Sequence, residues 1–138
     1  PFTFNDVSYS PGLLKAETFR NGKVVASQTV YTPGKAVRIQ LSVADEGVPL
    51  KADGADVVFI RATLLDSAGH PVYANGATAN KLIQFSLIGN GQIVSPKDRV
   101  TEAGIASILV QSTIRKGKIS IKAVGDGLKG DELKLISK

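Results

Sequence analysis

The sequence contains no cysteine, no methionine and no tryptophan. Without cysteine, the chain has no disulfide, no thiolate nucleophile and no cysteine metal ligand. The lack of methionine predicts that the chain is a piece of a longer polypeptide, because it holds no initiator residue. With no tryptophan and only Tyr9, Tyr31 and Tyr73 as tyrosines, the sequence offers little material for an aromatic sugar-binding platform.

Long apolar runs are missing as well, although 43% of the 138 residues are hydrophobic. No run approaches the ~18 residues that a membrane-spanning helix needs, so the sequence predicts a globular chain without a membrane partner. The length suits one domain of ordinary size together with the remnant of another.

Positive charge is in moderate excess, because 17 Lys and Arg residues stand against 12 Asp and Glu residues, a net charge of +5. The basic residues are scattered along the chain, and only Arg115-Lys116-Gly117-Lys118 is locally dense. Aromatic residues are 6% of the chain and do not interleave with the basic ones. Nucleic-acid binders usually combine the two, so no nucleic-acid partner is predicted.

A β-hairpin is predicted over residues 13–31. Its centre is Asn21-Gly22, a pair that tolerates the positive φ angles of a tight type I′ turn. Alternation places Leu14, Val24, Ala26 and Val30 on one apolar face. Two strands do not make a stable domain alone, so this hairpin needs a partner.

From Gly34 onward apolar and polar residues alternate with a period of two, and no helical apolar stripe lasts three turns. The expected strands cover residues 37–43, 55–66, 83–87, 92–94, 106–110, 119–123 and 133–135. In the second of these, Val57, Phe59 and Leu65 oppose the main apolar face, which predicts a strand covered on both sides over part of its length. The pattern predicts an all-β fold, an immunoglobulin-like antiparallel sandwich of about seven strands preceded by the extra hairpin. Its core is expected to include Ile60, Phe85, Ile108 and Ile121.

Three motifs suggest chemistry, and each has a simpler interpretation. Residues Gly125 to Gly130 match the G-x-G-x-x-G pattern, but a dinucleotide site needs a following helix, and the segment 131–138 alternates like a strand. This motif is therefore predicted to be a hairpin turn. His70 lies in a Gly-His-Pro turn without an evident nucleophile or orienting carboxylate, which predicts a solvated loop histidine. The stretch 53–56 is similar to a calcium loop but lacks EF-hand spacing, so Asp53 and Gly54 are expected to turn the chain and Asp56 to cap that turn.

Glycoside hydrolysis requires two carboxyl groups facing each other across a cleft. The acidic residues fall mainly in predicted turns, as at Asp45, Glu46, Asp66, Asp98, Glu102 and Asp126. No catalytic, cofactor-binding or metal-binding residue is therefore assigned, and no cofactor is expected.

Two sets of residues together resemble the C-terminal region of bacterial family 2 glycoside hydrolases of the β-galactosidase type. The first set is the hairpin pattern carried by Pro11, Gly12, Leu14, Ala16, Phe19, Asn21, Gly22, Lys23, Val25, Ala26, Thr29, Val30, Thr32 and Gly34. The second is a series of landmarks at 52–54, Asp56, 66–69, 71–72, Phe85, 89–91, 110–112, 117–119 and 127–128. One departure lies between Val94 and Gly104, where the family usually carries a longer loop.

The resemblance implies that residues 1–33 are the last strands of a preceding immunoglobulin-like domain and that residues 34–138 form one complete domain. The family's catalytic glutamates lie on an upstream barrel, so none is carried over to this chain. The implied role is a non-catalytic structural module of an exported enzyme, periplasmic or extracellular, which contacts the other domains of its parent. A homodimer through the 13–31 hairpin is a second expected contact. A bacterial adhesin repeat and a carbohydrate-binding module remain as alternatives.

Overall fold

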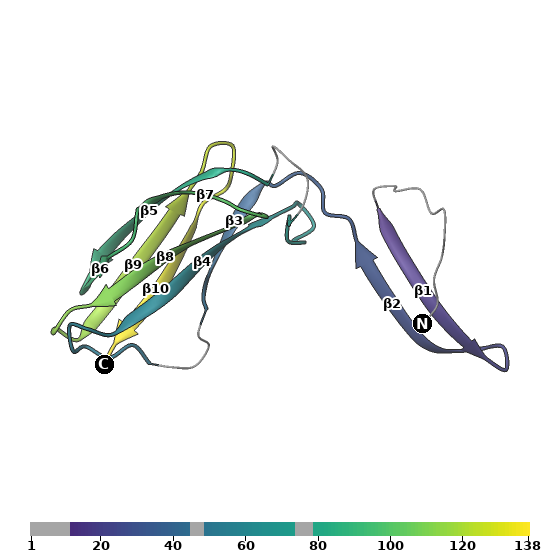
Figure 1. Ribbon diagram of the computed structural model, residues 1–138, viewed down its shortest axis with the longest axis horizontal. Helices are drawn as coiled ribbons and strands as arrows, with labels where there is room; N and C mark the ends of the chain where they lie inside the picture. Colours follow the sequence, from purple (N-terminus) through teal and green to yellow (C-terminus); the bar gives the residue numbers. More distant parts are fainter. Residues whose placement is uncertain (1–11, 45–48, 74–78) are drawn as a thin grey trace. The chain divides into compact units, whose positions relative to one another are not determined.

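The computed structural model describes residues 12–44, 49–73 and 79–138 (Figure 1). Contacts between residues divide the chain into two compact units, Pro1–Pro33 and Gly34–Lys138. The described residues contain no helix, and so none that could cross a membrane. The assignment of the first unit to a preceding domain stays a prediction.

The first unit contains an antiparallel hairpin of β1 (Leu13–Arg20) and β2 (Lys23–Tyr31). Asn21 and Gly22 form its turn with φ angles of 52° and 73°, which confirms the predicted hairpin. Every residue of both strands is exposed.

One prediction about the hairpin is wrong, because its register shifts near the turn. Thr18 pairs with Ala26, but the next residue, Phe19, pairs with Val24, so Val25 is an extra residue in β2. Partners across a ladder project to the same side, and neighbours along a strand project to opposite sides. Val24 therefore shares a face with Phe19 and not with Ala26 and Val30.

The second unit is a sandwich of two four-stranded antiparallel sheets, which confirms the predicted fold class (Figure 1). The first sheet, here the β4 sheet, has the order β3 (Arg38–Val43), β4 (Val57–Leu65), β8 (Ile105–Ser112) and β6 (Gly91–Ile93). The second, the β9 sheet, has the order β10 (Asp131–Ser137), β9 (Gly117–Val124), β5 (Leu82–Gly89) and β7 (Asp98–Val100). The chain changes sheets at Gly89, whose φ of 114° and close approach to the Lys118 carbonyl leave no room for a β-carbon.

Strand β7 was not predicted. Its residues Asp98, Arg99 and Val100 are all exposed and show no apolar alternation. The strand exists because it pairs with β5, where Leu82 lies opposite Val100 and Gln84 opposite Asp98. It lies in the stretch between Val94 and Gly104, where the resemblance described above implies a longer loop.

The core lies between the two sheets and contains the four predicted residues. Ile60, Ile108 and Ile121 are at most 1% exposed and Phe85 is 4% exposed, so the predicted faces are confirmed. The expectation that β4 is covered on both sides is correct at the buried Leu65 and wrong at Val57 and Phe59, which are 47% and 49% exposed. β4 is central within its sheet, but none of the described residues covers its outward face at these two positions.

The two sheets meet where β3 passes the turn before β10. Lys129 donates its N–H to the Val37 carbonyl and accepts the Ile39 N–H, both at 2.9 Å, which sets Lys129 beside Arg38 in a parallel bridge. Asp131 adds a side-chain contact, because its Oδ2 accepts the Leu41 N–H at 2.7 Å. The segment 125–130 is thus a hairpin turn, as predicted, and also closes one edge of the sandwich.

Candidate functional site

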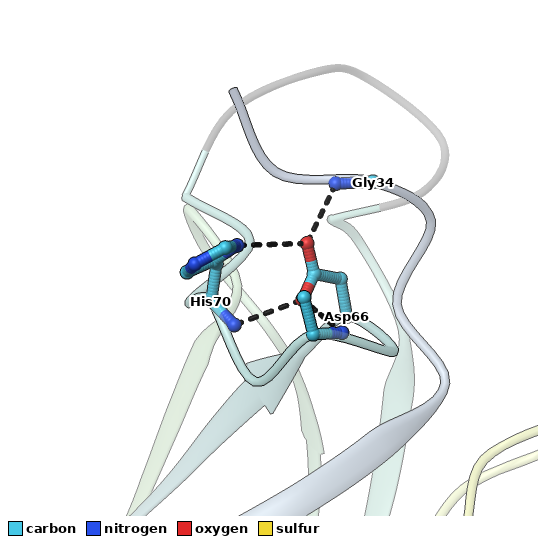
Figure 2. Close-up of polar contacts among 4 residues, drawn as sticks. Gly34, Asp66 and His70 are labelled. Carbon is cyan, nitrogen blue, oxygen red and sulfur yellow. Dashed lines mark hydrogen bonds and ion pairs between the residues drawn. The ribbon is translucent and has the colours of Figure 1, made fainter. Parts of the chain in front are cut away.

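Asp66 has the densest polar contacts among the described carboxyl groups. It follows β4 and begins the turn 66–70, and its side chain is only 6% exposed. Its Oδ1 accepts the N–H groups of Ala68 at 2.9 Å and His70 at 2.8 Å, while Oδ2 accepts the Gly34 N–H at 2.9 Å (Figure 2). One carboxylate therefore holds its own turn and also the residue at which the second unit begins. We call this arrangement the Asp66 clamp.

Hydrogen bonding sets the charge state of Asp66. The Gly34 N–H is the largest influence that lowers the pKa of this carboxyl, and the N–H groups of His70 and Ala68 act in the same direction. Burial acts in the opposite direction and is outweighed. Asp66 is ionised at neutral pH, as an ordinary aspartate is, and its lowered pKa extends the ionised, hydrogen-bond-accepting form to more acidic solutions.

His70 lies beside the clamp, with Nδ1 3.6 Å from Asp66 Oδ2 (Figure 2). An Asp–His pair orients a general base in some enzymes through a direct hydrogen bond to the imidazole, and the 3.6 Å separation here is longer than such a bond. Here three backbone N–H groups already occupy the Asp66 oxygens, which suits a role in holding the turn. The sequence placed His70 in a turn correctly. It did not indicate the role of Asp66, because its partner Gly34 lies 32 residues earlier in the chain.

The turn over 53–56 is built in the same way. Asp53 Oδ1 accepts the N–H groups of Ala55 and Asp56, and Asp56 Oδ2 accepts the Lys51 N–H at 2.8 Å. The two carboxylates cap the backbone as predicted. Across the described ranges, no three His, Asp or Glu side chains come together in a way that could hold a metal ion.

Among the described residues, the carboxyl groups with a shifted pKa do not suit the acid of a glycosidase. Such an acid needs a raised pKa so that it holds its proton near neutral pH. In the described part of the chain three carboxyl groups have a shifted pKa, and each shift is downward. The causes are hydrogen-bond donors, namely the Ala55 N–H at Asp53, the Gly34 N–H at Asp66 and the Ser120 hydroxyl at Glu132.

Comparison with known proteins agrees with the resemblance read from the sequence. The sequence model of the glycoside hydrolase family 2 C-terminal domain 5 matches residues 39–134. A β-galactosidase of Bacteroides ovatus is 30% identical over 142 residues, covering 94% of this chain and 16% of the enzyme. A β-glucuronidase of Formosa agariphila is 28% identical over 135 residues, covering 93% of this chain and 14% of the enzyme.

A solved structure extends the likeness to three dimensions. A glycosyl hydrolase family 2 member from Bacteroides cellulosilyticus superposes with a TM-score of 0.80 at 28% identity, covering 96% of this chain and 18% of that protein. The chain thus spans less than a fifth of each of these three relatives. Because the family model covers most of its length, the chain belongs to glycoside hydrolase family 2, as part of the C-terminal region of such enzymes.

Proposed function

We propose that this chain is a non-catalytic C-terminal module of a β-galactosidase-like family 2 glycoside hydrolase that acts in carbohydrate breakdown. The match of residues 39–134 to a C-terminal domain of that family carries the proposal. The short span of the relatives that it covers supports it, because most of each enzyme lies outside the matched region. The module serves as a rigid structural part that packs against the catalytic portion of its parent.

The chemistry of the carboxyl groups supports a structural role. Asp53, Asp56 and Asp66 accept backbone N–H groups and hold turns. Glu132 accepts a hydrogen bond from Ser120. The resemblance implies that the catalytic glutamates belong to a barrel elsewhere in the parent. We further propose that the hairpin β1–β2 completes a preceding immunoglobulin-like domain and that the parent is periplasmic or extracellular.

Hydrolysis assays test this function. The purified chain is expected not to hydrolyse a chromogenic β-galactoside or β-glucuronide at a rate above that of buffer. A longer polypeptide that includes the chain and an upstream barrel is expected to hydrolyse one of them. Turnover by the chain alone, abolished by replacing one of its own carboxyl groups, would show that the module is catalytic.

An adhesin repeat or a carbohydrate-binding module would predict different surroundings. Tandem copies of this unit in the parent gene would favour the adhesin, whereas an upstream barrel with two glutamates favours the hydrolase. A row of aromatic side chains on one sheet face would favour sugar binding. Among the described strands of the β4 sheet, Phe59 is the one exposed aromatic residue. A single aromatic side chain does not make such a row.

A further inference from the structure

Two positive side chains lie next to each other where β3 meets the turn before β10. The parallel bridge makes Arg38 and Lys129 direct neighbours, and neighbours in register project to the same side. Neither residue forms an ion pair with a described acidic side chain. The ion pairs among the described residues are Lys15–Glu17, Asp66–His70 and Lys122–Glu132. Like charges placed opposite each other destabilise a ladder, so this position favours a negatively charged ligand.

The surface is hollowed at the same place. A cavity of about 260 Å³ is lined by Arg38, Ile39, Gln40, Lys129, Gly130 and Asp131. The Gln40 side chain makes no hydrogen bond within the described ranges and adds two more N–H donors beside the cations. The residues that line the cavity therefore include three whose side chains carry a guanidinium, an ammonium and a carboxamide.

The one acidic residue of the cavity is already engaged. Each oxygen of Asp131 accepts a backbone N–H, that of Leu41 at Oδ2 and that of Glu132 at Oδ1, at 2.7 and 2.9 Å. These two bonds hold the carboxylate against the backbone of β3 and β10. Asp131 keeps its negative charge, but it forms no ion pair with Arg38 or Lys129 among the described residues, and the two cations outnumber it.

The Asp66 clamp contributes to the position of Arg38. A β-carbon at Gly69, in the turn that Asp66 holds, would lie 3.0 Å from Arg38 Nη2, so the guanidinium lies close against that turn. Gly69 has a φ of 89° and no side chain, and this lets the guanidinium approach. A guanidinium supported in this way loses less freedom when it binds a ligand.

We propose that the cavity between β3 and the 125–130 turn is a binding site for a small oxyanion, a carboxylate or a sulfate group. The planar guanidinium of Arg38 binds two oxygens of such a group, and Lys129 supplies a second charge to it. The inference goes beyond the proposed structural role and does not depend on it.

Nuclear magnetic resonance of the full chain labelled with ¹⁵N tests this proposal. The chain is titrated with sodium glucuronate, with sodium sulfate and with sodium chloride at matched ionic strength. Saturable shifts are expected for the amides of residues 38–40 and 129–131 with at least one oxyanion and not with chloride. Comparison of the glucuronate titration with the sulfate titration shows whether the site binds a carboxylate or a sulfate group.

Variants distinguish specific binding in the cavity from nonspecific attraction of anions to a positively charged protein. Arg38→Gln and Lys129→Gln are each expected to weaken the binding by roughly tenfold or more, the effect of losing a charge-assisted hydrogen bond. Lys118→Gln removes the same charge from β9 and is expected to leave the affinity unchanged. Shifts that do not saturate, that occur equally with chloride, or that persist unchanged in both cavity variants would overturn the proposal. Well-dispersed amide spectra establish that each variant is folded.

Discussion

At the scale of single residues, Asp66 shows how one side chain can join distant parts of a fold. Its oxygens accept N–H groups from two residues of its own turn and from Gly34, where the second unit begins. The same turn lies against the guanidinium of Arg38. A carboxylate in this position contributes to stability only while it is ionised, so its effect depends on pH.

The first prediction concerns that pH dependence. Because the pKa of Asp66 is lowered in the folded state, its contribution is present above the unfolded-state pKa, about 3.9, and is lost as the pH falls through the folded value. Asp66→Asn is therefore expected to reduce the free energy of unfolding at neutral pH, with a deficit that shrinks as the solution is acidified. Urea titrations at several pH values measure the deficit. Asp126→Asn, in an exposed turn, is the control, and a deficit independent of pH would contradict the clamp.

The second prediction concerns Ser112, at the end of β8. The residue is 2% exposed, and its hydroxyl has no hydrogen-bond partner in the described part of the chain. A buried hydroxyl without a partner is destabilising, so Ser112→Ala is expected to raise the free energy of unfolding by about 1 kcal/mol. Ser42→Ala on the exposed side of β3 provides the comparison in the same urea titration. A loss of stability in Ser112→Ala would show that the hydroxyl has a partner.

At the scale of elements, the two faces of each strand differ in what they contribute. β4 buries Val58, Ile60, Ala62 and Leu64 against the β9 sheet and leaves Val57 and Phe59 half exposed. Alternating burial of this kind is typical of an antiparallel sandwich. The stability of the sandwich is therefore expected to depend on the inward face of each strand.

A pair of phenylalanines tests this difference between the faces. Phe85 in β5 is 4% exposed, so Phe85→Ala is expected to cost about 3–5 kcal/mol in the free energy of unfolding. Phe59 in β4 is 49% exposed, so Phe59→Ala is expected to cost about 1 kcal/mol. Urea titration measures both. A cost below ~1 kcal/mol at Phe85 would mean that the register of β5 is wrong by one residue.

At the scale of the whole molecule, the β1–β2 hairpin stands out because it buries none of its residues. Leu13, Leu14, Phe19, Val24, Val25, Val30 and Tyr31 are all between 48% and 66% exposed. A two-stranded ribbon is marginal in water, and its free edges can pair with another chain. We expect the hairpin to pair two copies of the chain at high concentration or to be poorly ordered in solution.

Light scattering tests this expectation on the full chain and on a version that begins at Gly34. The full chain is expected to show a concentration-dependent increase in mass, and the shortened version is expected to stay monomeric. Hydrogen exchange of the hairpin amides is measured in parallel. If both versions are monomeric and the hairpin amides are strongly protected, the division between Pro33 and Gly34 is wrong.

Local patterns were sufficient for much of this architecture. Alternation with a period of two identified the inward faces at Ile60, Phe85, Ile108 and Ile121, because the side chains of a strand point alternately to its two sides. Asn21-Gly22 located the hairpin turn, because its backbone conformation depends on those two residues alone. The resemblance to family 2 glycoside hydrolases also rested on short motifs. These features need only residues close together in the sequence.

Other features depend on residues that meet only after folding. β7 is a strand because β5 lies beside it, and Val24 changes face because one extra residue enters the ladder. The Asp66 clamp joins positions 32 residues apart, and the cavity joins Arg38 to Lys129 across most of the domain. The alternation of apolar and polar residues in the sequence predicts which side chains each strand buries. Which polar groups come together is determined by the pairing of distant strands, and that pairing is a property of the folded chain.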